Sequence, residues 1–307
     1  MELLIISFFQ RAMINAVPLL FASTGEIVTE RSGILNLGVE GMMALGAFIA
    51  FAVSFSTGSL LVGILAAMGS SGLLALVHGV ATIGFKANQT VSGLAITMVG
   101  VGLAGFWGKS FVGLKLPFPD RVPTLGFLTP IPFIGPVLGS LDLFFWGSLA
   151  LAAATWFFLH RTTPGLWIRT VGENPRAAEA QGLPVETLRY GSVVFGGMAA
   201  GLAGAYLSLS MGSSWIENTT GGRGWVAVAL TILALWNPLR AIWAAGLFGL
   251  LFVLQFTLQP FGISSSLLEM LPYLATLTVL VIDGLRRDHR HLGAPASLGE
   301  PYSREER

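Results

Sequence analysis

Long intervals without a charged residue divide most of the chain. No Asp, Glu, Lys or Arg occurs between Glu40 and Lys86, or between Lys86 and Lys109. Similar intervals lie between Asp142 and Arg161, Arg189 and Glu217, Arg223 and Arg240, and Arg240 and Glu269. A helix needs about 20 apolar residues to cross a bilayer, so the first interval has room for two helices. With a first span near residues 3–25 and a last near 264–282, the pattern predicts an all-α, polytopic transmembrane bundle of about eight or nine spans.

Two basic segments define the predicted orientation. They are the loop 160–190 and the tail 285–307, each of which carries several arginines. Cytoplasmic loops of membrane proteins are rich in Lys and Arg, so we expect both segments on the cytoplasmic side. An even number of predicted helices separates them, which agrees with a common side. The same assignment places the N-terminus and the loop 109–140 outside.

The domain organisation follows from these spans. Residues 1–284 are predicted to form one transmembrane domain with an outer loop at 109–140 and a cytoplasmic loop at 160–190. The outer loop is rich in proline, which a regular helix does not tolerate in its interior. The tail 285–307 is charged and poor in apolar residues, so we predict that it is disordered.

Composition narrows the class of protein. Hydrophobic residues make up 53% of the chain and charged residues only 11%, against roughly 25% charged in an average soluble domain. The 39 glycines suit membrane helices, whose small residues allow close packing. The absence of Cys and the scattering of the four His argue against a metal site. The net charge of +1, without a basic stripe, predicts no nucleic-acid partner.

One polar segment of the loop 160–190 predicts a short exposed helix. Asn174 suits the N-cap, Pro175 suits the first helical position, and Gly182 suits the end. The small side chains of this helix make one face nearly flat, so that it fits a groove on another protein. The alternative is that the helix is only a connector at the membrane interface. The residues assigned to this docking role are Gly172, Glu173, Asn174, Pro175, Ala177, Ala178 and Gly182.

Polar residues next to predicted spans are candidates for a solute pathway. Asn36 and Glu40 are four apart, so we expect them on one face of a helix. A carboxylate at the start of a membrane helix is a functional candidate. The structural alternative is that Glu40 pairs with Arg31 or caps neighbouring backbone. The glycine-rich turn containing Asn218 and Arg223 lies on the predicted outer side, where either a pathway mouth or a plain loop fits it.

No nucleotide-binding motif is evident. The run 107–110 has the Gly-Lys-Ser of a phosphate loop, but Leu103 stands where that loop requires glycine. If transport is driven by ATP, another chain must hydrolyse it. The sequence also lacks the Gly-x-Ser-x-Gly and His-Glu-x-x-His elements expected of an intramembrane hydrolase.

Three runs of sequence together resemble a known family. They are ERSGILNLGVEGMM at 30–43, GENPRAA at 172–178, and GRGWVA at 222–227 followed by WNPL at 236–239. The chain resembles ABC importer permeases of the simple-sugar and nucleoside branch. The first run is most similar to the shorter of the two permeases in nucleoside importers that use basic-membrane-protein-type binding lipoproteins.

The resemblance implies a function and a set of partners. The chain would be a permease subunit in the bacterial cytoplasmic (inner) membrane, surrounded by lipid, and would form half of the pathway for a nucleoside or simple sugar. The segment 172–182 would be the coupling helix that docks on a cytoplasmic ATPase. A second permease, making a heterodimer, and an extracytoplasmic binding protein would complete the transporter. This chain would bind no cofactor, because the ATPase uses the ATP.

Two other functions are the alternatives to an ATP-driven importer. Broken helices with a buried carboxylate also fit an ion-coupled secondary transporter. The small number of ionisable groups inside the predicted spans, together with the capped cytoplasmic helix, counts against it. An intramembrane enzyme requires a nucleophile with a base, or clustered metal ligands, and the sequence offers neither.

Overall fold

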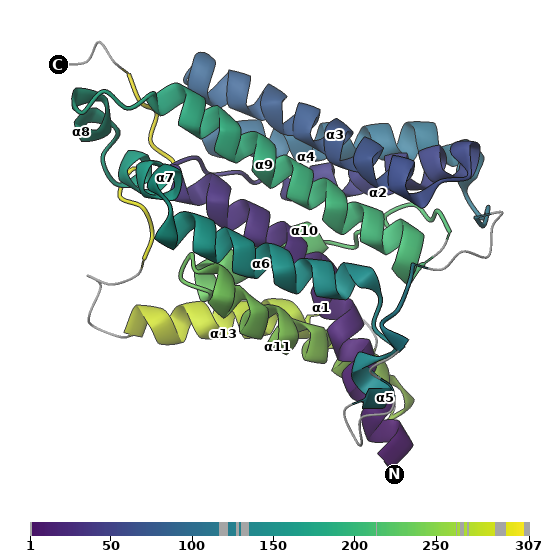
Figure 1. Ribbon diagram of the computed structural model, residues 1–307. Coiled ribbons are helices and arrows are strands. Elements are labelled where there is room, and N and C mark those ends of the chain that lie inside the picture. Colours follow the sequence, from purple (N-terminus) through teal and green to yellow (C-terminus); the bar gives the residue numbers. More distant parts are fainter. Residues whose placement is uncertain are drawn as a thin grey trace.

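The computed structural model describes residues 2–116, 122–126, 129, 135–212, 214–261, 263–264, 267–268, 270–285 and 293–303. These residues form a helical bundle, and Figure 1 shows its long helices running side by side. The helices are α1 (Glu2–Arg31), α2 (Val39–Thr57), α3 (Leu60–Gly79), α4 (Gln89–Gly108), α5 (Gly135–Leu138), α6 (Leu143–Arg161), α7 (Thr163–Glu173), α8 (Pro175–Ala180), α9 (Val185–Tyr206), α10 (Arg223–Leu233), α11 (Pro238–Leu258) and α13 (Leu271–Leu285).

Within the described residues, 7 helices are long and apolar enough to cross a membrane: α1, α2, α3, α4, α6, α9 and α11. The prediction of a polytopic bundle is confirmed, but the predicted count of about eight or nine spans is wrong. The interval between Arg223 and Arg240 holds only α10, which has 11 residues. It ends early because Leu235 and Trp236 have φ values of 53° and 52°, a left-handed conformation that no α-helix contains.

The first helix is longer than predicted. The sequence places a span near residues 3–25, whereas α1 continues to Arg31. Glu26 and Glu30 therefore lie inside a membrane helix, where both side chains are buried. The charge of these residues suggests a helix end, but their neighbours in the fold supply polar partners that the local sequence does not reveal.

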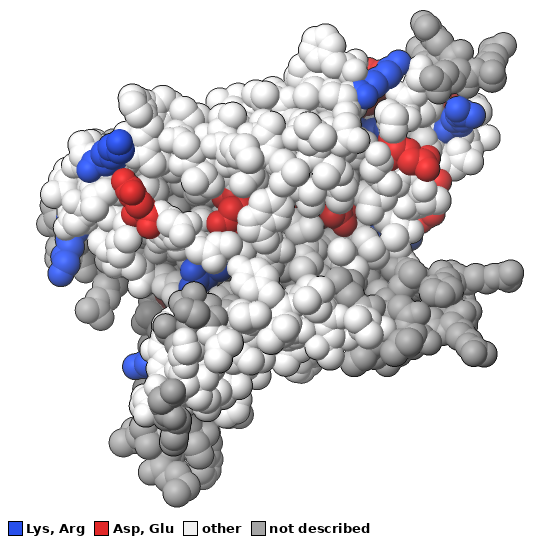
Figure 2. Space-filling view, turned by 180° about the vertical axis from the view of Figure 1, so that it is seen from behind, with Lys and Arg blue, Asp and Glu red and all other residues white. Residues whose placement is uncertain are grey.

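The core is built around three helices. In their most apolar windows, 89% of α1, 78% of α9 and 72% of α2 is buried, against 28% of α4 and of α6. The outer helices expose large apolar side chains such as Leu65, Met98 and Phe157. This is the surface expected of helices that face lipid, and Figure 2 shows that uncharged residues cover most of the surface between the two ends of the bundle.

Glycine allows close approach where helices cross. At Gly100 of α4, an added Cβ would collide with the backbone of Gly41 in α2. At Gly102, two residues along the same helix, a Cβ would meet no atom within 4 Å. The first glycine is therefore required by the packing of α2 on α4, and the second is not.

A buried histidine joins three segments. His78 of α3 is fully buried, with Nδ1 2.9 Å from Ser92 Oγ and Nε2 3.1 Å from the carbonyl oxygen of Leu35. These bonds connect α3 to α4 and to the segment between α1 and α2. His78 thus has a packing role with both ring nitrogens in hydrogen bonds.

Basic residues gather at one end of the bundle; this is the end that the sequence predicts to be cytoplasmic, and we call it the cytoplasmic end. Those placed there by their positions at helix ends and connections are Arg31, Lys86, Arg161, Arg169, Arg176 and Arg189. Residues 293–303, which the composition predicts to be disordered, lie across this same end and hydrogen-bond to it. For that part of the tail the structure differs from the prediction, because long-range bonds order a segment that has little apolar surface of its own.

Candidate functional site

A buried carboxylate fixes the start of the short helix α10. Glu40 is only 5% exposed, and its Oε1 accepts hydrogen bonds from Thr220 Oγ1 at 2.6 Å and from the amide of Gly222 at 2.9 Å. Its Oε2 accepts from the amide of Gly224 at 2.6 Å. The first amides of a helix have no partner within it and carry partial positive charge, so the carboxylate caps α10 both by hydrogen bonding and by charge.

The turn before α10 is shaped to present those amides. Asn218, Gly221 and Gly222 have φ values of 57°, 53° and 80°, and this succession of left-handed residues makes a tight reversal. At Gly224 an added Cβ would collide with the Cα of Glu40, so the close approach of α10 to α2 requires glycine there. The turn is therefore a structural element with a defined partner.

This contact lies in the interior of the bundle. Gly41, next to Glu40, packs against the backbone of Thr97 near the middle of α4. Figure 1 accordingly shows α10 near the centre of the bundle. The sequence places the turn at an outer mouth, whereas Thr220 in it is only 1% exposed. Asn218 is exposed, so the turn is buried on one side only.

Arg223, the first residue of α10, contacts the preceding turn and α11. Its Nη1 donates to the carbonyl oxygens of Thr219 at 3.4 Å and Thr220 at 3.2 Å, and its guanidinium carbon lies 5.1 Å from the ring centroid of Phe252. The cation and the aromatic face attract each other in a site of low polarity. This arrangement holds the arginine against the bundle.

Asn36 lies in the connection between α1 and α2. Its Nδ2 and its backbone amide each donate to the carboxylate of Glu26 at 3.3 Å, and its Oδ1 accepts from the amide of Gly38 at 2.9 Å. The prediction that Asn36 and Glu40 share a helix face is wrong, because the bond to Gly38 closes an Asx turn and delays the helix to Val39.

Two further carboxylates were missed as site residues. Glu26 bonds Asn36 as described, and Glu30 accepts a hydrogen bond from Nε1 of Trp236, which comes from the connection between α10 and α11. Arg31 donates its Nε to the carbonyl oxygen of Trp236 at 3.1 Å, so it contacts this connection and not Glu40. The four-residue spacing of the two glutamates is a signal in the sequence, but only on a helix that extends past residue 25.

Three glutamates are buried inside the membrane helices. The sequence counts few ionisable groups inside the spans, which disfavours an ion-coupled transporter. The structure buries Glu26, Glu30 and Glu40 to 1%, 1% and 5% exposure. Each accepts hydrogen bonds from groups outside its own helix, which gives it a structural role. The number of buried carboxylates therefore does not distinguish an ion-coupled transporter from an ATP-driven one. The capped helix at the cytoplasmic end and family membership do.

The predicted capped helix is present at the cytoplasmic end. Asn174 Oδ1 accepts from the amide of Ala177 at 3.0 Å, Pro175 begins α8, and Gly182 follows it with a φ of 80°. Ala177 is exposed, but Ala178 is fully buried beside Val171. The outer face of α8 therefore includes the first of these alanines and not the second.

A second helix in this loop was not predicted. Gly172 and Glu173 belong to the end of α7, whose N-cap Thr162 accepts from the amide of Gly165 at 3.2 Å. Pro164 in its first turn is a helix-start signal that the sequence contained. The loop 160–190 thus contains two helices, α7 and α8, joined at Asn174.

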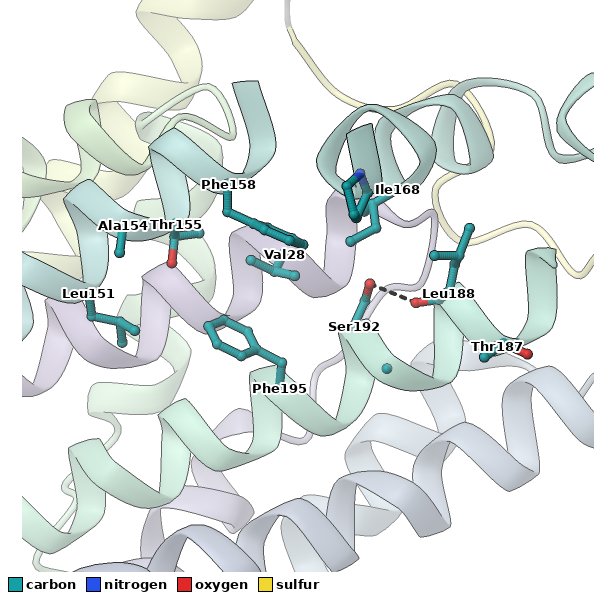
Figure 3. A pocket seen from close by; sticks show the side chains of 12 residues that line it. Val28, Leu151, Ala154, Thr155, Phe158, Ile168, Thr187, Leu188, Ser192 and Phe195 are labelled. Atoms are coloured by element: carbon teal, nitrogen blue, oxygen red, sulfur yellow. Dashed lines mark hydrogen bonds between the residues drawn. The ribbon is translucent and has the colours of Figure 1, made fainter. Parts of the chain in front are cut away.

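Apolar grooves separate α6 from α9. Figure 3 shows one of about 460 Å³, into which Val28, Phe158 and Phe195 point from three different helices. The hydroxyl of Ser192 in its wall donates to a backbone oxygen 2.8 Å away. A second groove of about 450 Å³ shares Leu151 with the first and is also almost wholly apolar. These grooves suit lipid or protein side chains, and they offer little to a polar solute.

The fold and the cytoplasmic end together define a multi-pass helical membrane protein with a short exposed helix between two of its spans. Residues 8–280 match the protein family described as "Branched-chain amino acid transport system / permease component", and the chain belongs to this permease family. It is therefore a transport subunit. No solved structure matches it.

Three relatives named as ABC transporter permease proteins support the same class. The chain is 38% identical to TsgC13 of Haloferax volcanii, an ABC transporter permease protein whose assignment to glucose is provisional, over 94% of this chain and 95% of the relative. It is 35% identical to the guanosine ABC transporter permease protein NupQ of Bacillus subtilis, over 94% of each chain. It is 30% identical to the nucleoside ABC transporter permease protein NupC of Lactococcus lactis, over 88% of this chain and 90% of the relative.

Proposed function

We propose that the chain forms half of the pathway of an ATP-driven importer for a nucleoside or a simple sugar in the cytoplasmic membrane. The observation that supports this proposal is α8, a capped and exposed helix between two membrane spans at the basic end of the bundle. A cytoplasmic ATPase docks on this helix and moves it. The relatives named for guanosine, nucleoside and glucose transport motivate the solute class.

ATP is bound and hydrolysed by the partner in this proposal. The phosphate-loop pattern fails at Leu103. The chain therefore supplies the docking surface and the moving helices, and binds no cofactor. A binding protein on the opposite side of the membrane delivers the solute.

A second permease completes the pathway. The grooves between α6 and α9 are apolar, so a path for a polar solute is better formed where two permease subunits meet. In two organisms the chain is similar to two different permease proteins, TsgC13 and TsgB13 in Haloferax volcanii and NupQ and NupP in Bacillus subtilis, which favours a heterodimer. Among the candidate lining residues, Asn218 is exposed and available to a solute, whereas Asn36, Glu40 and Arg223 bond within the chain.

Uptake by cells with and without the chain tests the proposal. Labelled guanosine, cytidine, ribose and glucose are supplied to wild type, to Ala177→Trp and to Ala87→Trp. Both alanines are exposed at the cytoplasmic end, but Ala87 lies between α3 and α4 and is the matched control. We expect Ala177→Trp to lower uptake at least about tenfold, because a large ring on α8 prevents docking of the ATPase.

The outcomes are distinct. Guanosine or cytidine uptake that is lost in Ala177→Trp supports both the docking helix and a nucleoside, and uptake of ribose or glucose alone changes the solute to a sugar. Full uptake in Ala177→Trp overturns the docking assignment. Uptake that follows an ion gradient after ATP is depleted supports a secondary transporter instead.

A further inference from the structure

Residues 293–303, which we call the C-terminal strap, close the end of α7. Ser297 is 6% exposed, and both its amide and its Oγ donate to the carbonyl oxygen of Gly172, at 3.0 Å and 2.7 Å. The last carbonyl groups of a helix lack partners within it, so Ser297 satisfies one of them. The amide of Ala296 also donates to the carboxylate of Glu173 at 3.3 Å. The strap thus holds α7 at the point where α8 begins.

Arg189 joins the strap to the core. This side chain is 2% exposed, its Nη2 donates to Ser297 Oγ at 3.3 Å, and its Nε donates to the carbonyl oxygen of Ser32 at 3.1 Å. Its guanidinium carbon lies 5.7 Å from the ring centroid of Tyr302. The hydroxyl of Tyr302 in turn donates to the carboxylate of Glu179 in α8. One buried arginine therefore connects α9, the strap and the segment that follows α1.

The strap also contacts two connections at the cytoplasmic end, the one between α1 and α2 and the one between α3 and α4. The amide of Gly299 donates to the carbonyl oxygen of Gly33 at 3.3 Å, and Lys86 Nζ donates to Ser303 Oγ at 2.9 Å. Gly33 lies three residues before Asn36, the partner of Glu26. A displacement of the strap therefore acts directly on the segment that leads into the buried carboxylate network.

The position of the strap brings it to the docking surface. A polar cleft of about 320 Å³ has residues 173–176, at the start of α8, on one side and residues of the strap on the other. A protein that docks on α8 therefore meets the strap as well.

We propose that the C-terminal strap positions the coupling helix and transmits its movement to the segment between α1 and α2. Ser297 and Tyr302 are positioning residues, because they act through α7 and α8. This inference rests on the proposed function of α8 as the docking helix. The position of α8 is, however, measurable without an ATPase, so the two ideas are tested separately.

Hydrogen exchange of the purified full-length chain tests the positioning. Ser297→Ala removes the Oγ bonds, Ser297→Thr keeps a hydroxyl, and Ala294→Ser changes an exposed residue of the strap as control. We expect amides of residues 172–185 to exchange about tenfold faster in Ser297→Ala, because the loss of about one buried hydrogen bond favours local opening by about that factor. Exchange stays at the wild-type rate in Ala294→Ser and is largely restored in Ser297→Thr. Unchanged exchange in the double variant Ser297→Ala, Tyr302→Phe overturns the positioning role.

Coupling is then measured in vesicles that contain the complete transporter. Uptake of labelled guanosine or glucose, whichever the wild type transports, and ATP hydrolysis are recorded for the same variants. We expect Ser297→Ala with Tyr302→Phe to lose several-fold more uptake than hydrolysis, so that less solute enters per ATP consumed. Uptake and hydrolysis that fall together, in proportion to assembled complex, make the strap a stabilising element only and overturn transmission. Failure of α8 as a docking helix is recognised separately, by full uptake in Ala177→Trp.

Discussion

Replacing Glu40 tests whether this carboxylate holds α10 or serves the solute. In Glu40→Gln, one acceptor oxygen becomes an amide nitrogen, which donates and so fails to accept from one of the two glycine amides. In Glu40→Ala all three bonds are lost, and the part-buried amide of Gly222 and the buried amide of Gly224 are left without their acceptor. Glu40→Gln therefore weakens the cap of α10, and Glu40→Ala removes it.

The expected magnitudes follow from those bonds. A hydrogen bond to a charged group contributes about 1.5–3 kcal/mol, so we expect Glu40→Gln to destabilise the protein by about 2 kcal/mol. A buried donor left unpaired costs about 1–3 kcal/mol, so two of them in Glu40→Ala make about 4 kcal/mol. At roughly 2–4 °C per kcal/mol, the midpoint of thermal unfolding falls by roughly 5 °C and 10 °C.

Thermal unfolding in detergent, followed by tryptophan fluorescence, measures this effect. Glu217→Gln is the matched control, since it makes the same chemical change at an exposed position just before the turn. We expect its unfolding midpoint to equal that of the wild type. A wild-type midpoint for Glu40→Gln would refute the capping role. If that variant also lost uptake, Glu40 would act on the solute instead.

Two further predictions concern helix packing and are measured by the same unfolding assay. Gly100→Ala forces a methyl group into Gly41 and is expected to cost about 1–3 kcal/mol, whereas Gly102→Ala is expected to be neutral or slightly stabilising; equal midpoints would contradict the packing of α2 on α4. His78→Leu leaves the part-buried carbonyl oxygen of Leu35 without its donor, at a cost of about 1–3 kcal/mol, and a variant as stable as the wild type would show that this bond contributes nothing.

Local signals in the sequence predicted the long helices and the cap of α8. The charge-free intervals contain most of α2, α3, α4, α6, α9 and α11, because the bilayer excludes charge from most positions of a span. Asn174 and Pro175 specify the start of α8 by bonds and dihedral angles within a few residues. Features that depend on neighbours along the chain are readable from one sequence.

Features that depend on distant partners were not predicted. The end of α10 involves Trp236, whose indole bonds Glu30 from 206 residues away. The extension of α1 past residue 25 depends on the same bond and on Asn36. Similarly, the strap is ordered by Ser297 bonding Gly172 across 125 residues. Composition and periodicity carry no record of such pairings, so the sequence predicted helix ends and disorder in their place.

The shortness of α10 has a consequence for biosynthesis. At 1.5 Å per residue its 11 residues span roughly 16 Å, about half of the hydrocarbon layer, so the insertion machinery has no full span to release into lipid. Its first amides need an acceptor inside the membrane, and Glu40, synthesised about 180 residues earlier, supplies it. During synthesis α2 therefore enters the membrane before the carboxylate of Glu40 has its hydrogen-bond donors from α10. The cost of burying this carboxylate is offset only when the α10 segment has been synthesised and packs on α2. The contact between α2 and α10 is therefore a late step in assembly of the fold.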